Sequence, residues 1–159
     1  MAATADAFAQ GNFQIEYSTN GSTWTEICSE ATSINPGDPE HAVGEQHVAC
    51  SEVPILTPSN KLAAREIEVN AVYTETSAEA WDGVYTAFMT AGRALYLRWS
   101  PAGGANGDLQ FTTSADGSTA GPGILTSCTI PEQDASSEDP ALFSFTLKCA
   151  AVIKAAISV

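Results

Sequence analysis

The sequence predicts a mostly-β domain, a β-sandwich or partly closed barrel of seven to nine strands with one flanking α-helix. Three observations support this fold class. Short runs in which apolar and polar residues alternate recur along the chain, turn signals rich in Gly, Pro, Asn and Asp separate them, and a single run has the 3.6-residue period of a helix. The 159 residues, 44% of them hydrophobic, suit one globular domain, residues 1–159, with no domain boundary and no internal repeat.

The first regular element predicted is a hairpin. Phe13, Ile15 and Tyr17 alternate with polar residues, which indicates a half-buried strand. Asn20-Gly21 is the strongest short hairpin signal, and residues 24–28 have the pattern of the return strand. The Ala-rich residues 1–12 before it are expected to form a flexible arm that can order on a neighbouring subunit.

Residues 29–47 are expected to form a long irregular loop. Pro36, Gly37 and Pro39 interrupt any regular element, and the segment has too few apolar residues to fold alone. It is therefore expected to pack against another subunit. The candidate contact residues are Asp38, Glu40, His41 and Glu45. A short strand is predicted from residue 48 to residue 55.

A strong strand is predicted at residues 65–74. Ile67, Val69 and Ala71 face one way, whereas Glu66 and Glu68 face the other. Further strands are predicted at 94–100, 109–113, 124–130 and 142–150. Residues 151–159 are apolar and suit either a last strand or a tail on a partner.

The one predicted helix covers about residues 77–91. Thr76 and Glu79 have capping-box spacing, and Gly92 suits a left-handed C-terminal cap. One apolar stripe faces the sheet. Its members are Trp81, Val84, Tyr85 and Phe88.

Composition excludes several function classes. The formal net charge of −13, with only six scattered Lys and Arg, argues against binding nucleic acid through its phosphates and against an anionic membrane surface. No apolar run is long enough to cross a bilayer. Residues 1–12 lack the features of a secretory signal, so synthesis in a cytoplasm is expected.

No catalytic or metal-binding constellation is predicted. The four cysteines form no C-x-x-C pair, and both histidines fall in the acidic loop, away from any nucleophile motif. We expect no metal and no cofactor. Cys128 and Cys149 are expected to be small core residues, and a Cys28–Cys50 disulfide would form only outside the cell.

Several features occur in an order that resembles a known family. An Ala-rich arm, the hairpin with Asn20-Gly21 and an acidic loop precede the strand at 65–74. A capped helix with Trp81 then leads to the strand ending in Arg98-Trp99-Ser100-Pro101. Over about residues 10–150 this order is similar to that of the tail tube protein, or major tail protein, of long-tailed bacteriophages.

The resemblance implies a structural role rather than catalysis. Six copies would form a ring, and rings would stack into a hollow tube in the virion tail, with a β-barrel around the lumen through which DNA passes without specific binding. The 1–12 arm and the 29–47 loop would reach the adjacent ring. Partners would be other copies of the chain, and the tape measure, tail terminator and tail tip proteins.

Charge patterning suggests site residues for such a tube. An acidic wall repels phosphate, and the lumen candidates are Glu16, Glu66 and Glu68, which lie on polar faces of strong strands. The candidates for charge pairs between subunits are Arg65, Arg98 and Lys148. Pairing within one subunit is an equal alternative for these cations, and each exposed pair would contribute about 0–1 kcal/mol.

Other readings of the sequence stay open at this point. A tail terminator or a capsid decoration protein would stop at one ring or a trimer. An immunoglobulin-like binding module could use Trp24, Trp81 and Trp99, although two of these are predicted to point into the core. Paired carboxylates such as Glu66 and Glu68 carry little weight for an enzyme, because nineteen acidic residues produce such pairs by chance.

Overall fold

The chain folds into strands with one helix, as predicted. The computed structural model describes residues 11–27, 30–50, 52–75, 79–131, 136 and 138–158. The elements in chain order are β1 (Gln14–Ser18), β2 (Thr25–Glu26), β3 (Ala31–Asn35), β4 (His41–Gln46), β5 (Ile55–Leu62), β6 (Arg65–Val72), α1 (Ala80–Met89), β7 (Ala94–Ser100), β8 (Leu109–Ser114), β9 (Gly123–Cys128), β10 (Leu142–Cys149) and β11 (Ala151–Ala156). Nine strands belong to one bent antiparallel sheet that does not close into a barrel, and β4 and β5 form a separate pair.

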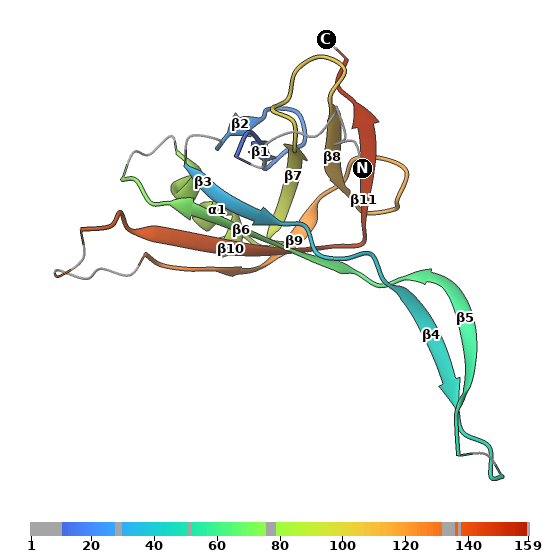
Figure 1. Ribbon diagram of the computed structural model, residues 1–159. Coiled ribbons are helices and arrows are strands. Elements are labelled where there is room, and N and C mark those ends of the chain that lie inside the picture. Colours follow the sequence, from blue (N-terminus) through green and yellow to red (C-terminus); the bar gives the residue numbers. More distant parts are fainter. Residues whose placement is uncertain are drawn as a thin grey trace, which may run out of the picture.

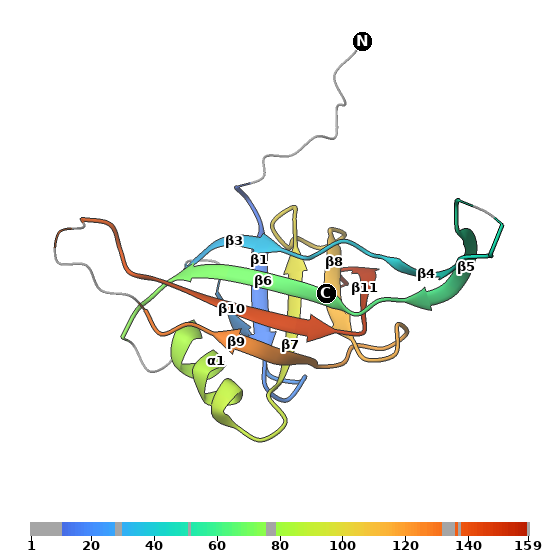
Figure 2. The ribbon, with the colours of Figure 1, turned by 90° about the horizontal axis from the view of Figure 1, so that it is seen from below.

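The nine-stranded sheet folds over itself into two layers joined at β7. One layer has the strand order β3-β6-β10-β9, and the other holds β1, β2, β7, β8 and β11. The start of β7 pairs with β9, whereas its end pairs with β1 and β8. Figures 1 and 2 show the strands of the two layers crossing, with α1 beside β9. A strand that changes layers in this way is how orthogonal sandwiches turn their corners.

The core lies between the layers and follows the predicted alternation. Ile67, Val69 and Ala71 of β6 are fully buried, and Phe143 and Phe145 of β10 stack beside them with ring centroids 6.3 Å apart. The predicted inward residues of β7 are also buried: Leu95, Leu97 and Trp99. Cys149 is buried and Cys128 is half-buried, and burial raises the pKa of the Cys128 thiol to about 11.

The prediction of one irregular loop at 29–47 is wrong. This stretch contains β3, which pairs with β6, and β4, which pairs with β5, and the link 36–40 between them is irregular. The strand expected at 48–55 is also wrong, because β5 starts at Ile55 and continues through Pro58 to Leu62. Pro58 is tolerated because β5 has a second strand on only one side, so a missing N–H need not break a ladder.

The helix begins three residues later and ends two residues earlier than predicted. Glu79 is the N-cap residue and makes no capping hydrogen bond with its side chain, so it is not the third residue of a capping box. Thr76 lies outside the described residues. Glu30, far away in sequence and buried, accepts a hydrogen bond from the Ala80 N–H instead, at 3.3 Å. Burial raises the pKa of the Glu30 carboxyl, and the nearby Glu79 raises it further.

Gly83 of α1 leads to the first prediction, because this glycine is required by packing. A Cβ at this position would lie 2.1 Å from the hydroxyl oxygen of Tyr17, a side chain that is only 6% exposed. Gly→Ala in a helix normally stabilises by about 0.5–1 kcal/mol. Here we expect Gly83→Ala to destabilise by about 1–2 kcal/mol, because the core must shift. Urea denaturation checks this, and the substitution should cost less in a Tyr17→Phe background.

The turn after β1 is built on side-chain acceptors. β1 and β2 form the predicted hairpin, with Tyr17 opposite Thr25. Asn20 Oδ1 accepts hydrogen bonds from the N–H groups of Ser22 and Thr23, both at 2.8 Å. Ser18 Oγ accepts one from Gly21, whose φ of 75° suits glycine. The hairpin therefore turns through an Asx-type turn.

The same turn occurs a second time after β8, although no repeat was predicted. Asp116 Oδ1 accepts from the N–H groups of Ser118 and Thr119 at 2.8 and 2.9 Å, and Ser114 Oγ accepts from Gly117 at 2.8 Å. The shared pattern is Ser-x-Asn/Asp-Gly-Ser-Thr, at 18–23 and 114–119. Since β1 and β8 both pair antiparallel with β7, two matching turns follow the two neighbours of one strand.

The matching turns yield the second prediction. Hydrogen bonds from Thr119 and Ser118 lower the pKa of Asp116 from 3.8 to about 2. The ionised carboxylate therefore stabilises the fold fully above about pH 4, and this contribution is lost as the pH falls through about 2. Asp116→Asn should fold normally, because Asn20 holds the same turn. Thermal melts between pH 6 and pH 2 should show the stability difference between wild type and Asp116→Asn declining below pH 4, and a constant difference would contradict this.

Candidate assembly surfaces

The layer β3-β6-β10-β9 has one buried and one polar face. On the outer side, register places Glu68 opposite Thr146, Glu66 opposite Lys148, and Asn70 opposite Ser144. We call this surface the polar face; its residues are Ser33, Asn35, Glu66, Glu68, Asn70, Ser127, Ser144, Thr146 and Lys148, and the exposed apolar Ile124 and Leu142 lie on the same side. Hydroxyl and amide side chains predominate. An antiparallel sheet with one solvated face of this kind is ordinary in a soluble protein.

Two of the three lumen candidates lie together on the polar face. Glu66 and Glu68 of β6 are exposed, and Lys148 of β10 lies across from Glu66 without an ion pair within 4.0 Å among the described residues. Each chain therefore presents two carboxylates and one ammonium group here. Arg65 lies on the other side of its strand, where it is near Cys149.

Glu16 belongs to the other layer and is paired. It lies on β1 beside Arg98 of β7, which donates Nε–H to Glu16 Oε2 at 2.5 Å and Nη2–H to Oε1 at 3.0 Å. The guanidinium also stacks over the ring of Trp24, 4.1 Å from its centroid. Arg98 thus has the intrasubunit partner that the sequence left as an alternative. The side chains are only 27% and 15% exposed, so the bidentate pair is well shielded from water.

The most unusual surface is the β4–β5 pair, which we call the arm. It projects from the body as a two-stranded ribbon (Figures 1 and 2). All but one of its strand residues are exposed, and its root is closed by a hydrogen bond from the Ala63 N–H to the Glu40 carbonyl oxygen at 2.8 Å. Isolated hairpins are only marginally stable in water. The ribbon therefore has almost no packing contacts of its own with the body.

Apolar side chains make the arm more unusual still. Register places Val43 opposite Pro58 and Glu45 opposite Leu56, so Val43, Leu56 and Pro58 share one face with the charged Glu45. Val43 is 58% exposed and Leu56 63%. Ile55, on the other face, is 55% exposed. These residues were not predicted as contact residues, because β4 and β5 have other bounds than the predicted loop and strand.

The four predicted contact residues lie at the root and along the arm. Asp38 and Glu40 belong to the link before β4, His41 begins β4, and Glu45 lies near its end. All four are exposed. Glu45 pairs with His47 at 3.2 Å. Cys50, beyond β4, is an exposed free thiol, and Cys28 lies outside the described residues.

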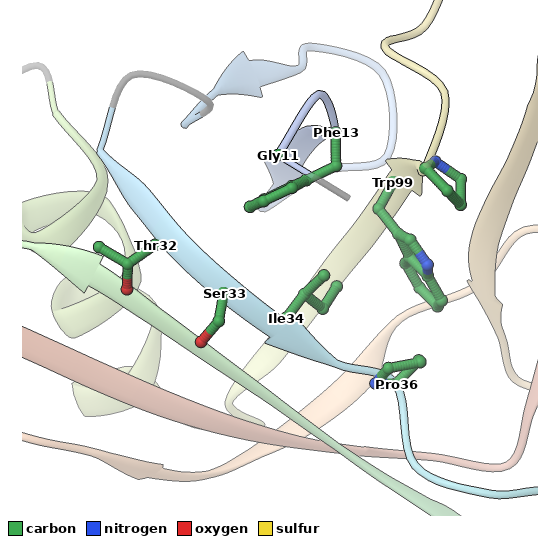
Figure 3. A pocket seen from close by; sticks show the side chains of 8 residues that line it. Gly11, Phe13, Thr32, Ser33, Ile34, Pro36 and Trp99 are labelled. Carbon is green, nitrogen blue, oxygen red and sulfur yellow. The ribbon is translucent and has the colours of Figure 1, made fainter. Parts of the chain in front are cut away.

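A groove opens between the two layers beside β3 (Figure 3). It has a volume of about 600 Å³ and lies along the edge of β3, on the side away from β6. Phe13, Ile34 and Trp99 supply apolar walls. The full lining is Gly11, Phe13, Thr32, Ser33, Ile34, Pro36, Trp99 and Pro101, which contains no charged side chain.

No group of three or more His, Cys, Asp or Glu residues in the described part of the chain is close enough to hold a metal ion. No helix among the described residues is long and apolar enough to cross a membrane. The shielded carboxylate Glu30 is used as a helix cap.

No family model matches the sequence, and no curated protein does. Solved structures are similar in fold. A chain in the sheath/tube terminator of an extracellular contractile injection system (PVC) has a TM-score of 0.68 at 17% identity, covering 97% of this chain and 100% of that one. A chain in the PVC sheath–tube complex has a TM-score of 0.65 at 14% identity, with 96% and 94% covered.

The likeness extends to other tail-like particles. A chain in the tail of an empty gene transfer agent particle, with C6 symmetry, has a TM-score of 0.61 at 10% identity, covering 96% of this chain and 100% of that one. A chain in the tube-terminating cap of the anti-feeding prophage has a TM-score of 0.63 at 20% identity, with 99% and 100% covered. At these identities the comparisons establish a shared fold over nearly the whole chain.

Proposed function

We propose that this protein is a structural subunit that assembles into six-membered rings, which stack into the hollow tube of a phage tail or a related tail-like particle. The fold similarity supports a tail role, since the similar chains come from tubes, terminators and tails. In this proposal the protein is not an enzyme. Its site of action is the virion tail, after synthesis in the cytoplasm of a bacterial host.

The arrangement of the layer β3-β6-β10-β9 carries the proposal. Each neighbouring pair is antiparallel, so four strands alternate in direction. Among the described residues, no strand pairs with the outer edge of β3, and β9 pairs with the start of β7 through Gly123 and Ile124. With an even number of alternating strands, β3 of one copy is antiparallel to β9 of the next. Copies placed side by side can therefore continue one antiparallel sheet around a ring, which removes the free edges.

In such a ring we propose that the polar face lines the channel. Glu66 and Glu68 outnumber Lys148 there, so the wall would carry net negative charge and would not bind phosphate. DNA would slide through without specific contacts. The further partners proposed are the tape measure, tail terminator and tail tip proteins. Arg65 and Lys148 remain candidates for charge pairs between subunits.

A tube terminator is the second candidate. Two of the similar structures are a sheath/tube terminator and a terminating cap, and the fold does not separate these roles. The arm favours a tube subunit, because a ribbon exposed on both faces suits contact with a stacked ring.

Negative-stain electron microscopy of the purified protein, combined with sedimentation velocity, tests the proposal. Hollow tubes with a regular axial repeat are the expected result. Single rings that never stack would favour the terminator, and a species that forms neither rings nor tubes with its natural tail partners would contradict both.

A further inference from the structure

The chain contains two Asn-Gly pairs, Asn20-Gly21 and Asn106-Gly107, and both asparagines are exposed. An asparagine before glycine can convert to isoaspartate without an enzyme. The glycine nitrogen attacks Cγ of the asparagine, the new N–Cγ bond forms as the Cγ–Nδ2 bond breaks, and ammonia leaves with the glycine proton. Water then opens the resulting succinimide ring to isoaspartate or aspartate. Glycine permits the attack because it has no Cβ to obstruct the ring.

The folded turn at Asn20 opposes this reaction. Asn20 Oδ1 accepts hydrogen bonds from the N–H groups of Ser22 and Thr23, both at 2.8 Å, and from the Ser18 hydroxyl at 3.1 Å. The attacking nitrogen is also held, because the Gly21 N–H donates to Ser18 Oγ at 2.9 Å. To present Cγ to that nitrogen, the Asn20 side chain would have to rotate away from its three donors.

The turn at Asn106 lacks this protection. The Asn106 side chain is exposed and makes no hydrogen bond with the described residues. A Cβ added at Gly107 would meet no atom within 4 Å, whereas one at Gly21 would lie 3.0 Å from ring carbons of Tyr96. Space for the succinimide ring is therefore open at Asn106 and closed at Asn20.

A restraint on the attacking nitrogen of Gly107 comes from the end of the chain. The Gly107 N–H donates to the Ile157 carbonyl oxygen at 2.9 Å, and the Ile157 N–H donates to the Asp108 carbonyl oxygen, also at 2.9 Å. Ile157 follows β11, which lies at an end of the strand order and whose last three residues are exposed. Such an end opens more readily than the core, so the Gly107 nitrogen is released without unfolding of the sandwich.

We propose that Asn106 is a site of spontaneous deamidation to isoaspartate in the folded protein, whereas Asn20 is protected by its turn. The product has an extra methylene group in the main chain and a carboxylate in place of the amide. This lengthened backbone displaces Gly107 and Asp108, the two residues that hold Ile157, so the end of β11 is loosened. The inference goes beyond the proposed assembly and does not depend on it.

Peptide mapping of the aged protein tests this site. The purified full chain is incubated at mildly alkaline pH in heavy-oxygen water, which labels newly hydrolysed succinimide, and electron-transfer fragmentation distinguishes isoaspartate from aspartate. A parallel sample in concentrated urea removes the turns. The matched variant is Ser18→Ala, because the Ser18 hydroxyl holds both Asn20 Oδ1 and the Gly21 N–H.

In the folded protein, labelled isoaspartate should form about tenfold or more faster at position 106 than at position 20. In urea the two positions should convert at similar rates, and Ser18→Ala should raise conversion at position 20 alone. Hydrogen exchange of the converted protein should show weaker protection at residues 152–157.

Equal rates at the two positions in the folded protein, or no conversion at position 106 while the urea sample converts there, would overturn the site. Conversion in Ser18→Ala that rises at both positions, or at neither, would overturn the protection assigned to the turn. Unchanged exchange at residues 152–157 would overturn the loosening of β11.

Discussion

Removing the arm is expected to leave a folded protein that does not stack into tubes. Replacing residues 41–62 by a short Gly/Ser linker is structurally conservative, because the Ala63 N–H and the Glu40 carbonyl oxygen already lie 2.8 Å apart. Val43, Leu56 and Leu62 are more than half exposed, so their loss removes little of the core. Circular dichroism should retain the β spectrum, with a melting temperature near that of the full chain, while electron microscopy and sedimentation show no tubes.

A milder variant controls for this deletion. Leu56→Glu and Thr57→Glu add the same charge to opposite faces of one strand. The first should block assembly and the second should affect it less. A deletion of residues 29–47 would be uninformative, because it also removes β3 and the partly buried Ile34 from the main sheet. Tubes of normal length from the 41–62 replacement would contradict the role of the arm.

Arg98→Ala is expected to lower the free energy of unfolding by about 2–3 kcal/mol. The substitution leaves the carboxylate of Glu16, 15% exposed, without its two charged hydrogen bonds. It also removes the cation–π contact with Trp24, which contributes about 0.5–1 kcal/mol. Urea denaturation of the monomer, in the arm-free background, measures the loss.

A double-mutant cycle shows whether the pair is responsible. Glu16→Gln and Arg98→Gln should each destabilise, and the double variant should lose less than the sum of the two. Arg98→Lys should recover only part of the stability, because an ammonium group cannot form the bidentate pair. If Arg98 instead pairs between subunits, the monomer would be unaffected by these substitutions and only assembly would weaken.

Local periodicity predicted the core well, for a physical reason. The alternation in 65–74 and 94–100 reflects burial of every second side chain, which is set by the strand itself. The helical stripe was also informative, since Val84 is buried, and Trp81 and Phe88 pack against the core. These signals depend on neighbours in sequence, so a single sequence reveals them.

The features that escaped prediction depend on distant parts of the chain. Glu30 caps a helix that begins fifty residues later, and nothing near Ala80 in sequence indicates that acceptor. Arg98 and Glu16 meet across 82 residues. β3 is polar because it is an edge strand with one solvated face. The Pro and Gly residues that follow it led to the prediction of a loop in place of this strand. The strands of the arm bury almost no side chains, so the sequence shows no alternation of apolar and polar residues from which these strands could be predicted.

The two matching turns could both have been predicted from local sequence alone. The Asn-Gly signal correctly gave a hairpin at β1–β2. The second turn, at Asp116, has Ser, Gly, Ser and Thr at the same offsets. Comparing turn sequences within one chain would have found it, because the acceptor geometry requires these residues.

A cryo-electron microscopy reconstruction of the assembled protein tests the central claim most directly. The proposal predicts a sixfold ring in which β3 of each copy lies antiparallel to β9 of the next, with Glu66, Glu68 and Thr146 facing a hollow channel. A ring in which the polar face points outward, or in which β3 and β9 do not meet, would contradict it.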